Sequence, residues 1–174
     1  MAMNEHQAGA QPELDDDTLA FARRVFQYAR AGTTDELATL LAQGLPRNLR
    51  NERGDSLLML ASYHGHVETT RLLLEQGADA ELQNDAGQTP LMGAAFKGDL
   101  AMATLLLDHG AQVDGIGRDG KTALMFAAMF DRVDIVRLLL QRGADPAIVD
   151  GSGMSAIDLA AKMGAQNAYM MLVR

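Results

Sequence analysis

The sequence predicts an all-α fold, a solenoid of stacked helix-turn-helix units whose connecting loops are shaped like β-hairpins. The first observation is a glycine that recurs every 33 residues and opens a Gly-x-Ser/Thr-x-Leu/Ile phrase, at Gly54, Gly87, Gly120 and Gly153. A second series has the same spacing, at Gly44, Gly77, Gly110 and Gly143. A third contains Gly32, Gly65, Gly98 and Gly164, with Asp131 in place of one glycine. Three series in phase indicate a stack of similar supersecondary units.

One unit, residues 84–116, reads NDAGQTPLMGAAFKGDLAMATLLLDHGAQVDGI. It resembles the ankyrin repeat, in which Thr-Pro-Leu-His-x-Ala-Ala-x-x-Gly leads to Leu-Leu-x-x-Gly-Ala. The resemblance implies about five repeats, including atypical units at the ends, at residues 18–50, 51–83, 84–116, 117–149 and 150–174. The first of these units lacks the Thr-Pro-Leu phrase. We therefore expect one ankyrin repeat domain over residues 18–174, after an acidic, flexible segment at residues 1–17.

A hydroxyl side chain stands at the expected start of four first helices: Ser56, Thr89, Thr122 and Ser155. Such a side chain accepts hydrogen bonds from backbone N–H groups that the first turn leaves without partners. Pro90 follows Thr89 at the first helical position, where its missing N–H group costs nothing. In the first repeat, Thr33 and Glu36 have the spacing of a capping box for the second helix.

The third glycine series follows the end of each first helix, where a left-handed residue reverses the chain. We expect this turn to persist at Asp131, because aspartate tolerates positive φ better than most side chains. The core-forming residues are leucine triplets in the second helices and alanine pairs in the first, at Leu72–Leu74, Leu105–Leu107, Leu138–Leu140, Ala94–Ala95 and Ala127–Ala128. No unit buries these faces alone, so we expect a continuous core through the stack.

The net charge of the chain is −8, and residues 1–17 contribute five carboxylates with no Lys or Arg. About −3 remains for the repeats, which argues against nucleic acid as a partner because binding to phosphates relies on clustered cations. Asp15–Asp17 have two interpretations. They form part of an acidic docking tail or, as we favour, supply negative charge at the start of a helix over residues 18–31.

Catalytic chemistry finds little support in the sequence. The chain has no cysteine and four scattered histidines, so we expect neither a metal site nor a cofactor. The serines lack the context of a catalytic nucleophile. The N-terminal residues show no basic and apolar secretory signal, and no stretch is long and apolar enough to span a bilayer. We expect a non-enzymatic, cytoplasmic protein that does not associate with membranes.

The resemblance also indicates where a partner binds. In ankyrin repeat structures the hairpin tips and the outer surface of the first helices form a concave face. The residues expected there are Arg53, Asp85, Arg118 and Asp119 at the tips and Tyr63, His64, Phe96, Lys97, Met129 and Phe130 on the helices. Their apolar members form a row with a charged rim, which is the composition of a protein interface. The alternative is that the apolar side chains pack against neighbouring helices.

Three methionines differ from the ankyrin sequence pattern. The ankyrin phrase usually has histidine after Pro-Leu, whereas this chain has Met59, Met92 and Met125, and Asp158 in the last unit. Methionine makes no hydrogen bond to the capping hydroxyl. We therefore expect these methionines to fill the core or, alternatively, to extend the apolar floor of the groove.

The function that follows is a non-enzymatic module that binds another protein on its concave face. The wording around Tyr63 and Phe96 looks like that of small stand-alone ankyrin proteins of bacteria, which implies a regulator, inhibitor or protective partner of a bacterial enzyme or toxin. We expect a monomer rather than a homo-oligomer. The alternative is a structural or self-associating protein that uses the apolar last unit, Met163 to Val173, as its contact surface.

Overall fold

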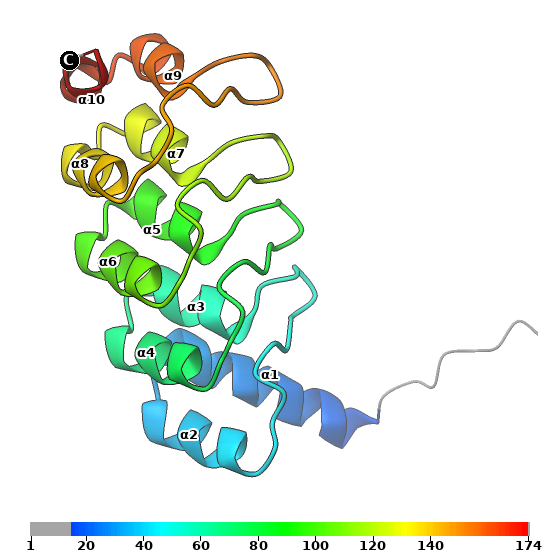
Figure 1. Cartoon of the computed structure of the whole chain (residues 1–174). Helices are drawn as coiled ribbons and strands as arrows, with labels where there is room; N and C mark the ends of the chain where they lie inside the picture. Colours follow the sequence, from blue (N-terminus) through cyan, green and yellow to red (C-terminus); the bar gives the residue numbers. More distant parts are fainter. Residues whose placement is uncertain (1–14, 174) are drawn as a thin grey trace, which may run out of the picture.

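The described residues, 15–173, form a stack of five helix pairs in the computed structural model (Figure 1). The first helices of the pairs are α1 (Asp16–Ala31), α3 (Leu57–Tyr63), α5 (Pro90–Lys97), α7 (Ala123–Met129) and α9 (Ala156–Met163). The second helices are α2 (Thr34–Ala42), α4 (Val67–Glu75), α6 (Leu100–Asp108), α8 (Val133–Gln141) and α10 (Gln166–Leu172). The prediction of an all-α repeat solenoid is therefore confirmed.

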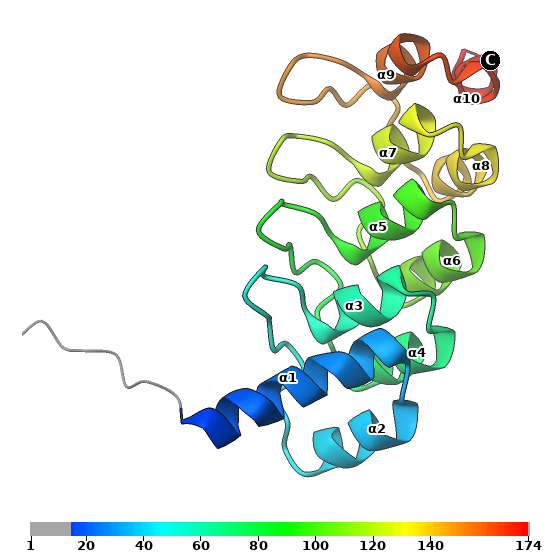
Figure 2. The same ribbon diagram turned by 180° about the vertical axis from the view of Figure 1, so that it is seen from behind.

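The helices lie in two layers, and the connecting loops project to one side of the stack (Figures 1 and 2). Each first helix packs against the first helix of the next repeat, and the second helices pack on one another in the same order. Two pairs of neighbouring loop tips are also joined: the Asp85 N–H donates to the Arg53 carbonyl at 3.0 Å, and the Gly151 N–H donates to the Asp119 carbonyl at 2.9 Å. The loops therefore form an edge beside the first helices.

The predicted hydroxyl caps are present at all four sites. Backbone N–H groups of the first turn donate to Ser56, Thr89, Thr122 and Ser155 at 3.0, 3.4, 3.4 and 3.3 Å. Pro90 opens α5 as predicted. The capping box predicted at Thr33 and Glu36 is wrong, because no backbone N–H group of α2 is bonded to the Thr33 side chain. The Thr33 hydroxyl instead donates to the Tyr28 carbonyl at 3.4 Å, at the exposed end of α1.

The turn at Asp131 has the left-handed geometry of the glycine turns. Its φ is 55°, against 78° at Gly98. The Asp131 carboxylate also accepts from the Ala168 N–H and from the Asn167 side-chain amide, each at 2.7 Å. Helix α10 has no side-chain cap of its own, because its cap position is Ala165. Asp131 thus supplies a cap to the helix of the following repeat.

A single apolar core extends through the stack, as predicted. The central residues of the leucine triplets, Leu73, Leu106 and Leu139, have no exposed surface. Ala95 and Ala128 are equally buried where first helices meet. None of the described helices is long and apolar enough to cross a membrane.

Of the acidic segment predicted at residues 1–17, only Asp15, Asp16 and Asp17 lie within the described residues. Asp15 is the cap of α1, and its carboxylate accepts from the Thr18 N–H at 2.6 Å. That hydrogen bond is the first cause of a lowered Asp15 pKa. Asp16 and Asp17 follow in the first turn, where negative charge is favourable.

Candidate functional site

The side chains predicted for the helical part of the concave face lie at the C-terminal ends of α3, α5 and α7. We call Tyr63, Phe96, Met129 and Phe130 the apolar row. Tyr63 and Phe96 are 41% and 38% exposed, whereas Met129 and Phe130 are half-buried. The rings of Phe96 and Phe130 form a T-shaped pair, with 4.7 Å between the ring centroids. The row is therefore open at its N-terminal end and partly covered at its C-terminal end.

Tyr63 is held in place by the repeat that follows it. The Lys97 ammonium lies 4.7 Å from the centre of the Tyr63 ring and donates to the Tyr63 carbonyl at 2.7 Å. The Tyr63 ring also lies against Gly93 of α5, where a Cβ atom would make an ordinary van der Waals contact with Tyr63 Cδ2 at 3.5 Å. Lys97, predicted on the helical part of the concave face, is thus engaged with its own chain. Its cation–π contact and hydrogen bond fix an aromatic platform on the face.

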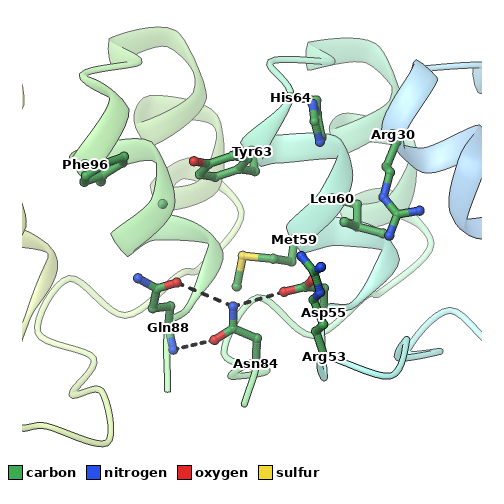
Figure 3. A pocket seen from close by; sticks show the side chains of 11 residues that line it. Arg30, Arg53, Asp55, Met59, Leu60, Tyr63, His64, Asn84, Gln88 and Phe96 are labelled. Atoms are coloured by element: carbon green, nitrogen blue, oxygen red, sulfur yellow. Dashed lines mark hydrogen bonds between the residues drawn. The ribbon is translucent and has the colours of Figure 1, made fainter. Parts of the chain in front are cut away.

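A hollow of about 360 Å³ opens beside this platform, between α1, α3, α5 and the loop tips (Figure 3). We call it the Tyr63 hollow. Tyr63 and Phe96 line it from the helices, Met59 and Leu60 lie beneath, and Asn84 and Gln88 belong to the loop edge. Its size is that of a small ligand pocket, enough for one or two side chains of a partner.

Two arginines, Arg30 and Arg53, line the Tyr63 hollow. Within residues 15–173, the guanidinium groups of Arg30 and Arg53 make no hydrogen bond or ion pair. The Asp55 carboxylate also lines the hollow, but two amide groups occupy it: Asn51 donates at 3.3 Å and Asn84 at 3.0 Å. The hollow therefore carries an excess of positive charge in a chain whose net charge is −8.

His64 adds a titratable group to the Tyr63 hollow. Partial desolvation lowers its pKa, and the charges of Lys97, His66 and Arg30 lower the pKa further. The positive charge of the surroundings thus disfavours another positive charge at this place. His66 itself bonds the Arg30 carbonyl at 2.7 Å through Nε2, which ties α1 to the turn of the second repeat.

The predicted tip residues fall into two groups. Arg53 and Asp85 are exposed near the hollow, and Arg118 is exposed on the next tip, close against Gly87. Asp119 is paired with Lys121, whose ammonium lies 2.7 Å from the Asp119 carboxylate and 3.6 Å from that of Asp150. The charges of the C-terminal tips are therefore satisfied within the protein, unlike those beside the Tyr63 hollow.

Asp150 is the buried member of this ion-pair group. The Ser152 hydroxyl, the Met154 N–H, the Ser152 N–H and Lys121 together lower the pKa of Asp150 to about 2. Asn51 and Asn84 hold the same position in earlier repeats, and each accepts two backbone N–H groups of its own loop. Sequence reasoning missed this series, although Asn51 and Asn84 are one period of 33 residues apart and Asp150 follows after two further periods, with Gly117 between them.

Sequence reasoning also missed Arg30, which has the same repeat phase as Tyr63 and Phe96. The methionines are mostly core: Met92 and Met125 are buried, whereas Met59, also buried, lines the Tyr63 hollow. Among the described residues, no group of three or more His, Cys, Asp or Glu side chains is arranged to hold a metal ion.

Two family models match the chain, and both describe ankyrin repeats. One, for three copies of the repeat, matches residues 25–116, and another, for many copies, matches residues 94–140 and 125–168. A curated protein of Pseudomonas aeruginosa that carries the name ankyrin repeat protein is 61% identical over 61 residues. That alignment covers 35% of this chain and 36% of the relative, about a third of each.

Proposed function

The chain belongs to the ankyrin repeat family, whose members generally bind other proteins, and on that premise we propose that it binds a partner protein on its concave face. The single observation that carries this proposal is the exposed, immobilised pair Tyr63 and Phe96. Exposed aromatic side chains above a hollow with polar edges have the composition of an interface centre. We infer a non-enzymatic and cytoplasmic role.

Contacts between repeats support the proposal because they fix the face before a partner arrives. Three side chains reach back to the carbonyl end of the preceding first helix: Lys97 to Tyr63, His66 to Arg30, and Arg132 to Phe96 at 3.2 Å. A surface that is already ordered loses little conformational entropy on docking. The face is therefore suited to a folded protein or a helix, and we propose that it regulates, inhibits or protects a bacterial enzyme or toxin.

Partner capture tests the proposal. The tagged chain and the triple variant Tyr63→Ala, Phe96→Ala, Met129→Ala are incubated with a lysate of the native host, and retained proteins are identified by mass spectrometry. We expect a protein that the parent retains and the folded triple variant does not. A control variant, Leu100→Ala with Val149→Ala, removes exposed apolar side chains outside the row and should retain it.

Two results would contradict the proposal. Equal retention by the parent and the triple variant would place binding elsewhere on the molecule. Unfolding of the triple variant, measured by circular dichroism, would assign these side chains to the core rather than to an interface.

Self-association is the second candidate, and the exposed C-terminal repeat favours it. Tyr169 and Met170 of α10 are 37% and 53% exposed, whereas Val136, one repeat before Tyr169, is fully buried under α10 and its neighbours. An uncovered apolar face can receive a second copy. We propose a monomer, so sedimentation equilibrium should give the mass of one chain at every concentration. A mass that doubles with concentration would favour the second candidate.

A further inference from the structure

We propose that the Tyr63 hollow binds an acidic side chain of the partner together with an adjacent aromatic or aliphatic side chain. This inference rests on the proposed function, because it names the segment that the concave face recognises. The occupant is a peptide segment in which Asp or Glu stands next to an apolar residue. Two independent features of the hollow, its charge and its walls, lead to this chemistry.

The charge of the hollow selects a carboxylate. Arg30 and Arg53 enter from α1 and from a loop tip, so their guanidinium groups face the same space from two sides (Figure 3). With Asp55 included, the three side chains leave one net positive charge, which matches one carboxylate. Guanidinium groups bind carboxylates through paired hydrogen bonds, and neither arginine has such a partner among residues 15–173.

The walls of the hollow select an apolar neighbour for that carboxylate. Tyr63 and Phe96 form one side, and Met59 and Leu60 form the floor. A volume of about 360 Å³ leaves space for a second side chain beside the acid. Aromatic contacts of this kind supply much of the binding energy at protein interfaces.

The pKa of His64 provides a test of binding in the hollow. If Arg30 and Arg53 had only a structural role, this pKa would not change when a peptide is added. The charged groups around it are Arg30 of α1, Lys97 of α5, His66 of the following turn, and Arg53 and Asp55 of the loop tip. A bound carboxylate offsets the repulsion from these cations, so the pKa of His64 should rise when the peptide binds. Binding should therefore tighten as the pH falls through the pKa range of His64.

A displayed peptide library tests the inference. Random peptides are panned on the full chain, enriched sequences are synthesised with a fluorescent label, and Kd is measured by anisotropy. We expect enrichment of Asp or Glu within two positions of an aromatic or aliphatic residue. Arg30→Ala and Arg53→Ala should each weaken binding at least about tenfold, whereas Arg23→Ala, the same charge change on the exposed surface of α1, should not.

The outcomes separate this inference from the proposed function. Enriched peptides without acidic residues, no enriched peptide, or equal losses from Arg23→Ala and Arg30→Ala would overturn the inference. If such peptides still lose binding in Tyr63→Ala, the concave face remains the binding face. If the peptides bind Tyr63→Ala, Arg30→Ala and Arg53→Ala as well as the parent, the proposed function loses its support as well. A His64 pKa that NMR titration finds unchanged by bound peptide would also contradict the assigned site.

Discussion

The two ends of the concave face use similar residues for different purposes. At the N-terminal end, Tyr63 and Phe96 are exposed, and the charges of Arg30 and Arg53 are unpaired among the described residues. At the C-terminal end, the corresponding apolar side chains are half-buried, and Lys121 pairs with both Asp119 and Asp150. The side chains at the N-terminal end are therefore available to a partner, whereas those at the C-terminal end interact mainly with other residues of the same chain.

The turns after the first helices also differ. Glycine makes the turn after α1, α3, α5 and α9, but Asp131 makes the turn after α7 and caps α10 with its carboxylate. The last repeat has no following neighbour among the described residues, so this contact compensates for a cap that Ala165 does not supply. The comparison teaches that changes at the N-terminal end should affect binding, and changes at the C-terminal end should affect stability.

The largest expected effect is on affinity for the captured partner. Tyr63→Ala with Phe96→Ala should weaken binding about a hundredfold or more, because aromatic side chains of this kind are typical hot spots. The unfolding transition should change little. Met129→Ala with Phe130→Ala should instead lower the free energy of unfolding by about 1–3 kcal/mol, because these side chains are half-buried. Surface plasmon resonance and urea denaturation of both variants measure the two effects, and the reverse pattern would break the comparison.

A smaller effect is expected at the turn after α7. Asp131→Ala should lower the free energy of unfolding by about 1–2 kcal/mol, because it removes the cap on Ala168 and keeps a side chain at positive φ. Asp131→Gly should cost less, since glycine adopts this φ freely although the cap is lost. Urea denaturation of both variants gives the order. If Asp131→Gly is the less stable of the two, backbone strain is not what separates the substitutions.

A further expected effect depends on pH. The pKa of Asp150 falls from 3.8 to about 2 on folding, mainly through the Ser152 hydroxyl. Because the folded state holds the proton less tightly, the Asp150 charge stabilises the fold above pH 3.8 and the gain disappears as the pH falls toward 2. Asp150→Asn should be less stable than the parent at neutral pH, and the difference should shrink below pH 4. A difference that is independent of pH would assign the loss to the hydrogen bonds alone.

Much of this arrangement follows from the sequence. The period of 33 residues placed the helix pairs, the hydroxyl caps and the turn at Asp131 correctly, because these features depend on local backbone geometry. The capping box at Thr33 is absent, and the Thr33 hydroxyl instead donates to the Tyr28 carbonyl of α1. Residues that act across repeats were harder to predict. Lys97 was expected to contact a partner on the concave face, but its ammonium donates to the Tyr63 carbonyl of the preceding repeat.

The candidate site shows the same limit. The repeat phase identified the apolar row, but which of its members are exposed depends on packing between neighbours, as with Phe130 against Phe96. The positive charge of the Tyr63 hollow arises from Arg30 of α1 and Arg53 of the following loop. The repeat phase places Arg30 in line with Tyr63 and the sequence places Arg53 at a loop tip, but that their side chains line one hollow follows only from the assembled structure.

Site-specific photo-crosslinking in the native host tests the central claim most directly. A photoreactive phenylalanine analogue is placed at position 63 in one variant and at position 169 in another, and adducts are identified by mass spectrometry. The account predicts that the analogue at position 63 forms adducts with peptide segments of a partner protein other than this chain. The analogue at position 169 should form no adduct with any protein. Adducts at position 169 alone, or adducts at either position that join two copies of this chain, would contradict it.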